Sequence, residues 1–85
     1  PQLYALLQQI KTEIIGGERN YRALESRTSQ SLNSTGFSVD YITIANARTL
    51  APAGPDDTDL IVAVAAKLGS TRLIDNISLA VVRDR

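Results

Sequence analysis

The sequence predicts an α+β domain in which two helices pack on one face of a three-stranded antiparallel sheet, in the order α-α-β-β-β. Apolar residues recur at helical spacing through the first 34 residues, and they then alternate or cluster in three short runs. Turns containing glycine or proline separate these segments. Two helices on one face of such a sheet would bury every apolar stripe in one core. The 85 residues therefore fit a single domain, 1–85, without internal repeats.

The first helix is predicted over residues 2–15. Its inward face carries apolar residues at helical spacing, namely Leu3, Leu6, Leu7, Ile10 and Ile14. Pro1 suits a first helical turn, where its missing N–H costs nothing. Gly16 and Gly17 end the segment, and we interpret them as a helix C-cap. A hinge is the alternative for this pair of glycines.

A second, more polar helix is predicted over residues 18–34. A narrow stripe should face inward, made of Tyr21, Leu24, Thr28 and Leu32. Gly36 follows as a stop signal. The other positions, which include Arg22 and Glu25, place this helix on the surface with one face inward.

The hydrophobic period changes after the helices and predicts a strand over residues 37–45. Phe37, Val39 and Tyr41 alternate with polar residues, and Ile42 and Ile44 then occupy the opposite face. The segment 46–58 follows as a loop within the domain, and its start could form a single helical turn. A linker between domains is the alternative for this loop.

Two further strands complete the predicted sheet. The continuous apolar run 60–66 is typical of a buried central strand at about 60–67, although its three alanines leave a helix open. A tight turn at 68–71 leads into a third strand at 72–80, with Leu73, Ile77 and Leu79 on one face. Val81 and Val82 would extend this strand, and residues 83–85 form a charged tail.

Composition excludes several classes of function. The chain has no cysteine and no histidine, so it lacks disulfides, the usual zinc ligands and the commonest general base. Nine basic and nine acidic residues balance without a Lys/Arg tract, which argues against binding to nucleic acid or membrane. No apolar run is long enough to span a bilayer, and no signal peptide opens the chain, so we expect a cytoplasmic protein. Because it starts at Pro1 within a helix, we expect a piece of a longer protein.

The segment 67–77 contains residues that a simple hairpin does not need. Asp75 shares a face with Leu73 and Ile77, so its carboxylate needs a partner, either Arg72 or backbone N–H groups of a neighbouring loop. With Asn76 it would form a hydrogen-bonded structural pair that holds the third strand to an adjacent loop. Arg72 either pairs with Asp75 or another surface acid, or it contacts a phosphate or carboxylate. Lys67 reaches a phosphate or is simply solvated.

The remaining polar and aromatic candidates have simpler interpretations. The loop acids Asp56, Asp57 and Asp59 offer oxygen ligands for magnesium, but clustered acids in a loop rich in proline and glycine are usually only solvated. Tyr21 and Tyr41 are interpreted as core or boundary aromatics. We therefore predict neither a metal site nor catalytic residues in this chain.

The nonapeptide 68–76, Leu-Gly-Ser-Thr-Arg-Leu-Ile-Asp-Asn, resembles the C-terminal signature of the pantoate–beta-alanine ligase family. Its flanks resemble the same family: the strand 39–44 reads Val-Asp-Tyr-Ile-Thr-Ile, 47–50 reads Ala-Arg-Thr-Leu, and 60–66 is the apolar strand before the signature. Order and spacing agree from about residue 37 to residue 79. The two helices add consistent architecture and little sequence specificity.

The resemblance implies a two-domain, ATP-dependent enzyme that joins pantoate and beta-alanine through a pantoyl adenylate, giving pantothenate, AMP and pyrophosphate. It implies that a Rossmann-like N-terminal domain binds ATP, magnesium and both substrates and makes the contacts of a homodimer. Nothing here matches the family's nucleotide motifs, so no catalytic residue is carried over. The implied role of this segment is a hinged lid, inactive alone, with Arg72 as the candidate for contact on closure. The alternative is a stand-alone interaction module, and a kinase following residue 85 is a variant of the first hypothesis.

Overall fold

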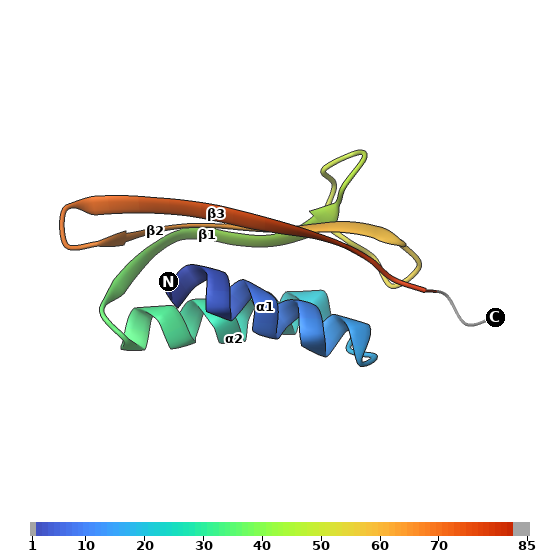
Figure 1. Cartoon of the computed structure of the whole chain (residues 1–85), viewed down its shortest axis with the longest axis horizontal. Coiled ribbons are helices and arrows are strands. Elements are labelled where there is room, and N and C mark those ends of the chain that lie inside the picture. The colour runs from blue at the N-terminus through green and yellow to red at the C-terminus, as the bar shows by residue number, and fades with distance from the viewer. Residues whose placement is uncertain (1, 83–85) are drawn as a thin grey trace.

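The computed structural model describes residues 2–82 and consists of two helices followed by three strands (Figure 1). The elements are α1 (Gln2–Ile15), α2 (Tyr21–Ser34), β1 (Phe37–Asn46), β2 (Asp59–Leu68) and β3 (Thr71–Ala80). Strand β2 lies between β1 and β3, and both pairings are antiparallel. The predicted order α-α-β-β-β and the α+β class are therefore confirmed. The charged tail, 83–85, lies outside the described residues.

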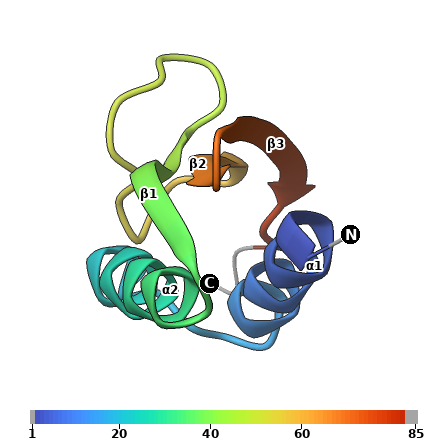
Figure 2. The ribbon, with the colours of Figure 1, turned by 90° about the vertical axis from the view of Figure 1, so that its left-hand side faces the viewer.

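The two helices form one layer and the sheet forms the other. Viewed end-on, α1 lies beneath β3 and α2 lies beneath β1 (Figure 2). Within residues 2–82 no helix covers the other side of the sheet, which we call the open face (Figure 1). Each helix has 14 residues, and neither is long and apolar enough to cross a bilayer.

A single hydrophobic core lies between the layers. Its most deeply buried side chains are at most 1% exposed and come from both layers: Leu7, Ile14, Leu24, Ile44, Leu60, Val62 and Val64. The central strand β2 reads as a continuous apolar run because the positions that alternate with its core-facing residues, Ile61, Ala63 and Ala65, are apolar as well. The helix that its alanines left open is not adopted, since β2 pairs with a strand on both sides.

Helix α1 ends in a glycine cap, as the sequence predicts. Gly17 has a φ of +121°, a conformation that glycine adopts without a Cβ clash. Its N–H donates to the Ile14 carbonyl at 3.0 Å, and the N–H of Glu18 donates to the Glu13 carbonyl at 3.0 Å. These two bonds make a Schellman motif, which satisfies carbonyls that the helix end would otherwise leave free.

Helix α2 begins at Tyr21, three residues later than the predicted start at residue 18. Asn20 is the N-cap, because its Oδ1 accepts a hydrogen bond from the Ala23 N–H at 3.2 Å. The Glu18 carboxylate accepts from the backbone N–H groups of Arg19 and Asn20. Local side-chain acceptors therefore hold residues 18–20 outside the helix.

A β-bulge at Asp40 explains the change of face within β1. Val39 pairs with Ala66 and Tyr41 pairs with Ala65, so Asp40 has no partner on β2. The extra residue reverses the alternation. Val39 and Ile42 therefore both pack against the core, whereas Tyr41 is 43% exposed on the open face. The expectation that Tyr41 shares a face with Phe37 and Val39 is wrong for this reason.

The loop 47–58 folds back on β1 and belongs to the same domain. Its start makes the single turn that the sequence suggested, closed by a hydrogen bond from Leu50 N–H to the Asn46 carbonyl at 2.8 Å. Pro52 then bridges to Ala45 in antiparallel fashion, with the Asn46 N–H donating to the Ala51 carbonyl. The second half of β1 therefore has backbone partners on both sides.

Candidate functional site

Charged side chains gather on the open face near the hairpin that joins β2 to β3. Arg72 Nε donates to Asp40 Oδ2 at 2.8 Å, so this ion pair joins β3 to β1 across the central strand. Lys67 on β2 lies in register opposite Arg72. Of the partners considered for Arg72, a surface acid is therefore correct and Asp75 is not. The two cations exceed the single carboxylate, so this part of the open face has an excess of positive charge.

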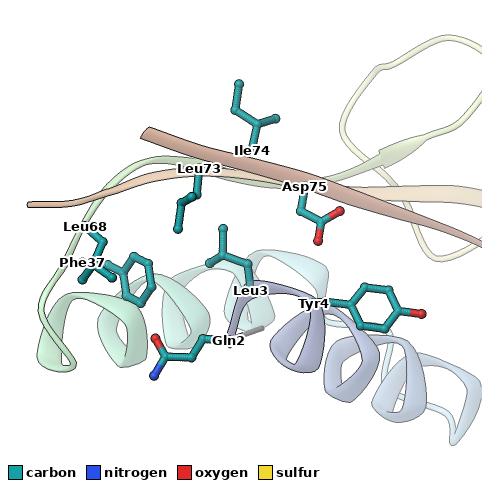
Figure 3. Close-up of a pocket in the computed structure, with 8 residues that line it drawn as sticks. All are labelled: Gln2, Leu3, Tyr4, Phe37, Leu68, Leu73, Ile74 and Asp75. Carbon is teal, nitrogen blue, oxygen red and sulfur yellow. The ribbon is translucent and has the colours of Figure 1, made fainter. Parts of the chain in front are cut away.

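Asp75 and Asn76 project to opposite sides of β3. Figure 3 shows Asp75 and Leu73 pointing toward the helices while Ile74 points away. Asp75 Oδ1 accepts a hydrogen bond from the Asn76 N–H at 2.8 Å. The carboxylate is therefore hydrogen-bonded, as expected, but its partner is the next backbone amide rather than Arg72 or a loop. The expectation that the pair ties β3 to an adjacent loop is wrong.

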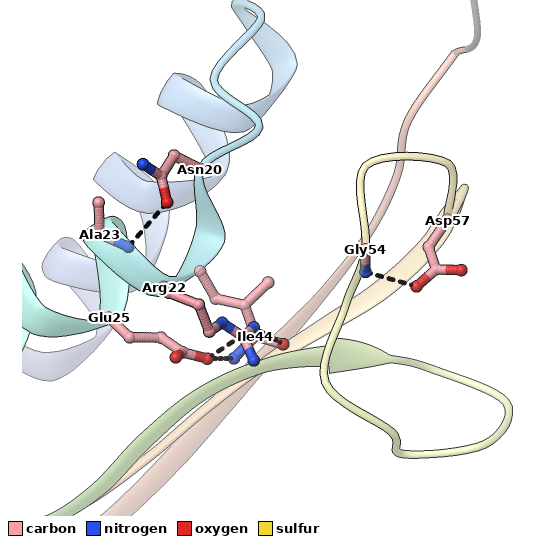
Figure 4. A network of polar contacts seen from close by, with 7 residues as sticks. All are labelled: Asn20, Arg22, Ala23, Glu25, Ile44, Gly54 and Asp57. Atoms are coloured by element: carbon pink, nitrogen blue, oxygen red, sulfur yellow. Dashed lines mark hydrogen bonds and ion pairs between the residues drawn. The ribbon is translucent and has the colours of Figure 1, made fainter.

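The loop acids do not assemble into a metal site. Within residues 2–82 no group of three or more carboxylates is arranged to hold a metal ion. Asp57 Oδ2 instead accepts a hydrogen bond from the Gly54 N–H at 2.8 Å and closes a turn (Figure 4). At Asp59, the backbone carbonyl accepts from the Ala47 N–H at 2.8 Å.

Two residues of α2 make a polar clamp on β1 that sequence reasoning missed (Figure 4). Glu25 Oε2 accepts from the Ile44 N–H at 2.7 Å, and Arg22 Nη2 donates to the Ile44 carbonyl at 2.8 Å. Arg22 and Glu25 also pair with each other at 3.0 Å. The sequence placed both on the solvated face, although their i, i+3 spacing was a signal that they act together. They satisfy backbone groups that an edge strand leaves free.

Tyr21 begins α2 as a core residue, as expected, with its side chain 2% exposed. Among the described residues its hydroxyl makes no well-formed hydrogen bond, although the Arg19 side chain lies close to it. Burial raises the pKa of the Tyr21 phenol above its ordinary value, and the nearby positive charge of Arg19 partly opposes this shift. Arg19 Nη1 itself donates to the Ile14 carbonyl at 2.7 Å and to the Glu18 carbonyl at 2.9 Å.

The charged part of the open face carries groups suited to binding and positioning. The sequence has neither histidine nor cysteine, which removes the commonest general base and the thiolate nucleophile. The open face offers a guanidinium, an ammonium and the half-exposed Tyr41, groups that orient anionic ligands. Lys67 and Arg72, the two sequence candidates for anion contact, therefore lie together, whereas Asp75 points to the other side of the sheet.

Comparison with known proteins places this arrangement in one family. Residues 1–78 match the family described as pantoate-beta-alanine ligase. All 85 residues align with the pantothenate synthetase of Alcanivorax borkumensis at 98% identity, covering 30% of that protein. The pantothenate synthetase of Nitrosospira multiformis is 46% identical over 78 residues, which is 92% of this chain and 28% of that protein. For the pantothenate synthetase of Hahella chejuensis, identity is 44% over 79 residues, with 93% and 28% covered.

The coverage is unequal in these matches. Nearly the whole of this chain is matched, whereas the chain spans only 28–30% of the length of these relatives. The matched region includes both helices and most of the sheet, together with Asp40, Lys67 and Arg72. The chain belongs to the pantoate-beta-alanine ligase family.

Proposed function

We propose that this chain is the C-terminal lid domain of a two-domain pantoate–beta-alanine ligase. The observation that carries the proposal is a family match over residues 1–78 in a chain that spans 30% of a relative 98% identical to it. The absence of histidine and cysteine from the sequence supports a covering role rather than a catalytic one. In this proposal the catalytic groups, ATP and magnesium belong to a Rossmann-like N-terminal domain.

The proposed reaction has two steps. The pantoate carboxylate attacks the α-phosphorus of ATP, which forms pantoyl adenylate and releases pyrophosphate. The amine of beta-alanine then attacks the acyl carbon, the bond from that carbon to the AMP oxygen breaks, and the nitrogen loses a proton to give pantothenate. Water would destroy the adenylate in competition with the amine, so a lid that excludes water favours ligation without supplying an acid or base.

Arg72 is the residue proposed to contact a phosphate or carboxylate when the lid closes. Its side chain is 46% exposed on the open face, and its position beside Lys67 gives that surface an excess of positive charge. Among the described residues, Asp40 is the carboxylate that engages it, through Nε. The terminal amino groups of a guanidinium can bind a second anion while Nε keeps the first.

The experiment that tests this proposal measures pantothenate formation by the full-length protein, by the isolated 85 residues and by three single-substitution variants of the full-length protein. We expect the 85 residues alone to show no turnover. Arg72→Gln should lower kcat/KM about tenfold, an effect equivalent to one lost charge-assisted contact, and Arg72→Lys should recover part of it. Arg48→Gln, on the exposed loop, is the matched control and should keep full activity. Turnover by the 85 residues, or undiminished kcat/KM in Arg72→Gln, would contradict the respective part of the proposal.

A stand-alone interaction module remains the alternative function. It predicts that the polypeptide preceding residue 1 in the natural protein is unrelated to nucleotide binding. The proposed lid requires a Rossmann-like domain there. The near-identical match to a much longer pantothenate synthetase favours the lid.

A further inference from the structure

The ion pair between Asp40 and Arg72 spans the width of the sheet. Neighbouring strands lie about 4.8 Å apart, so the backbones of β1 and β3 are separated by about 10 Å across β2. Asp40 Oδ2 nevertheless lies 2.8 Å from Arg72 Nε. The pair therefore forms on the same charged part of the open face that we propose to meet an anion when the lid closes.

The β-bulge in β1 supplies the acceptor of this bond. Asp40 is the extra residue of the bulge and has no partner on β2, and Tyr41 follows it, 43% exposed on the open face. Successive side chains of a regular strand point to opposite faces, so only one of these two would lie there. Bulges often re-aim a side chain beside a functional site. Here the bulge lets the Asp40 carboxylate reach toward β3 while Tyr41 also stays on the open face.

The atom that Asp40 engages leaves the rest of the guanidinium available for a ligand. The bond uses Nε, which carries one of the five N–H groups of an arginine side chain. The two terminal amino groups carry the other four, and they are the pair that binds a carboxylate or phosphate from the end of the side chain. A bond at Nε therefore fixes the direction of the guanidinium without using the groups that would meet an anion.

We propose that Asp40 is a positioning residue, which holds the Arg72 guanidinium on the open face in the orientation that meets the anion on lid closure. This inference rests on the proposed function, because Asp40 has this role only if Arg72 makes that contact. An arginine side chain that is not held samples many rotamers, and ordering it opposes binding. The bond from Asp40 orders the side chain before the lid closes.

Two other roles for Asp40 lead to different expectations. As a structural residue it would stabilise the fold, but the side chains of Asp40 and Arg72 are 40% and 46% exposed, and such pairs contribute little to stability. As a negative charge it would repel an incoming anion, so that its removal would improve activity. Lys67, in register opposite Arg72, offsets this repulsion. The positioning role alone predicts a loss of activity without a loss of stability.

The test is a double-mutant cycle on pantothenate formation by the full-length protein, made of Asp40→Ala, Arg72→Gln and the two combined. Asp40→Ala should lower kcat/KM about fivefold, and it should cause no further loss in the Arg72→Gln background. Because Asp40 acts through Arg72, the loss should be divided between kcat and KM as it is in Arg72→Gln.

Two further variants sharpen this test. Asp40→Asn keeps an acceptor oxygen for Nε and should retain most of the activity. The matched control is Asp59→Asn, an exposed acid at the start of β2, which should keep full activity. Urea denaturation of each variant should show little change in stability.

The Nε–H proton of Arg72 gives a measurement that does not depend on catalysis. In ¹⁵N NMR spectra of the same proteins, this proton should exchange with water more slowly than the Nε–H of Arg48 on the loop, because it is hydrogen-bonded. The protection should disappear in Asp40→Ala and persist in Asp40→Asn.

Several results would overturn the inference. Higher kcat/KM in Asp40→Ala would show that the carboxylate competes with the ligand, and additive losses in the cycle would show that Asp40 does not act through Arg72. A loss of activity that follows a loss of stability would assign a structural role. Full activity in Arg72→Gln would contradict the proposed contact on lid closure itself. Impaired activity in Arg72→Gln together with full activity in Asp40→Ala would contradict the positioning role alone.

Discussion

The two edge strands of the sheet are closed in different ways. Along β1, Glu25 and Arg22 of α2 take both backbone groups of Ile44, and the loop adds a bridge from Pro52 to Ala45. Along β3, the Asn76 N–H donates to the side chain of Asp75 in the same strand. An adjacent pocket at the start of α1 is lined by the exposed side chains of Tyr4 and Leu68. The chain therefore covers much of the β1 edge itself, whereas within residues 2–82 no other helix or loop bonds to the backbone of the outer β3 edge. Edge strands that remain open are ready to pair or pack with another segment.

The largest expected effect comes from breaking the closed edge at β1. Glu25→Ala leaves the buried Ile44 N–H without its acceptor, which should lower the free energy of unfolding by about 1–3 kcal/mol. Urea denaturation of the 85-residue chain measures this change. Glu25→Gln keeps an acceptor oxygen at the same place and should lose clearly less. Equal losses in both variants would mean that the ion pair with Arg22, rather than the bond to β1, stabilises this edge.

A gain in stability is expected from a substitution at Tyr21, the first residue of α2. Tyr21→Phe removes a buried hydroxyl that makes no well-formed hydrogen bond among the described residues, so the free energy of unfolding should rise by about 1 kcal/mol. Tyr41→Phe, at a half-exposed position, is the matched control and should change little. Loss of stability in Tyr21→Phe would show that the contact of this hydroxyl with Arg19 is a stabilising hydrogen bond.

The same tyrosine should make stability depend on pH in the alkaline range. Because burial raises the pKa of Tyr21 in the folded chain, the unfolded chain ionises first, near its usual value of about 10. Stability is therefore fully present below about pH 10 and falls as the pH rises above it. The difference in unfolding free energy between the unchanged chain and Tyr21→Phe should move in favour of the variant across this range. A difference that stays constant with pH would rule out the raised pKa.

At the β3 edge the expected effect is on association rather than stability. Asp75→Val removes an inward-pointing charge beside the pocket and adds a strand-forming side chain, so the 85-residue chain should self-associate more strongly. Stability should change by less than about 1 kcal/mol, since the Asn76 N–H can bond to water instead. Sedimentation measures the change in average mass. Asp40→Val, on β1, whose second half is covered by α2 and the loop, makes the same change of charge and should leave the mass unaltered. A mass increase there too would remove the distinction between the edges.

The smallest effect is expected where the two edge strands are linked across the open face. Asp40 and Arg72 are both substantially exposed, so a double-mutant cycle should give a coupling of at most about 1 kcal/mol that weakens with added salt. A larger coupling that salt does not reduce would mean that this pair is structural, and it would weaken the case for Arg72 as a contact on lid closure.

Hydrophobic periodicity predicted the helices and strands, because each segment carries apolar residues at a spacing that only one kind of secondary structure places on a single face. The start of α2 was placed too early, since the sequence stripe does not reveal that Asn20 caps the helix and Glu18 binds the preceding amides. The partner of Arg72 depends on the bulge at Asp40 and on strand register, which a local pattern does not specify. The clamp of Arg22 and Glu25 was missed because a polar helix face looks the same whether it meets water or a strand edge.

The central claim is that these residues protect an acyl adenylate that the rest of the enzyme makes. The most direct measurement is the ratio of AMP released to pantothenate formed, in the full-length protein and after deletion of these 85 residues. The account predicts one AMP per pantothenate in the full-length protein. After the deletion it predicts continued AMP release with far less pantothenate, because water captures the exposed adenylate. A deletion variant that still forms one pantothenate per AMP at an undiminished rate would contradict the account.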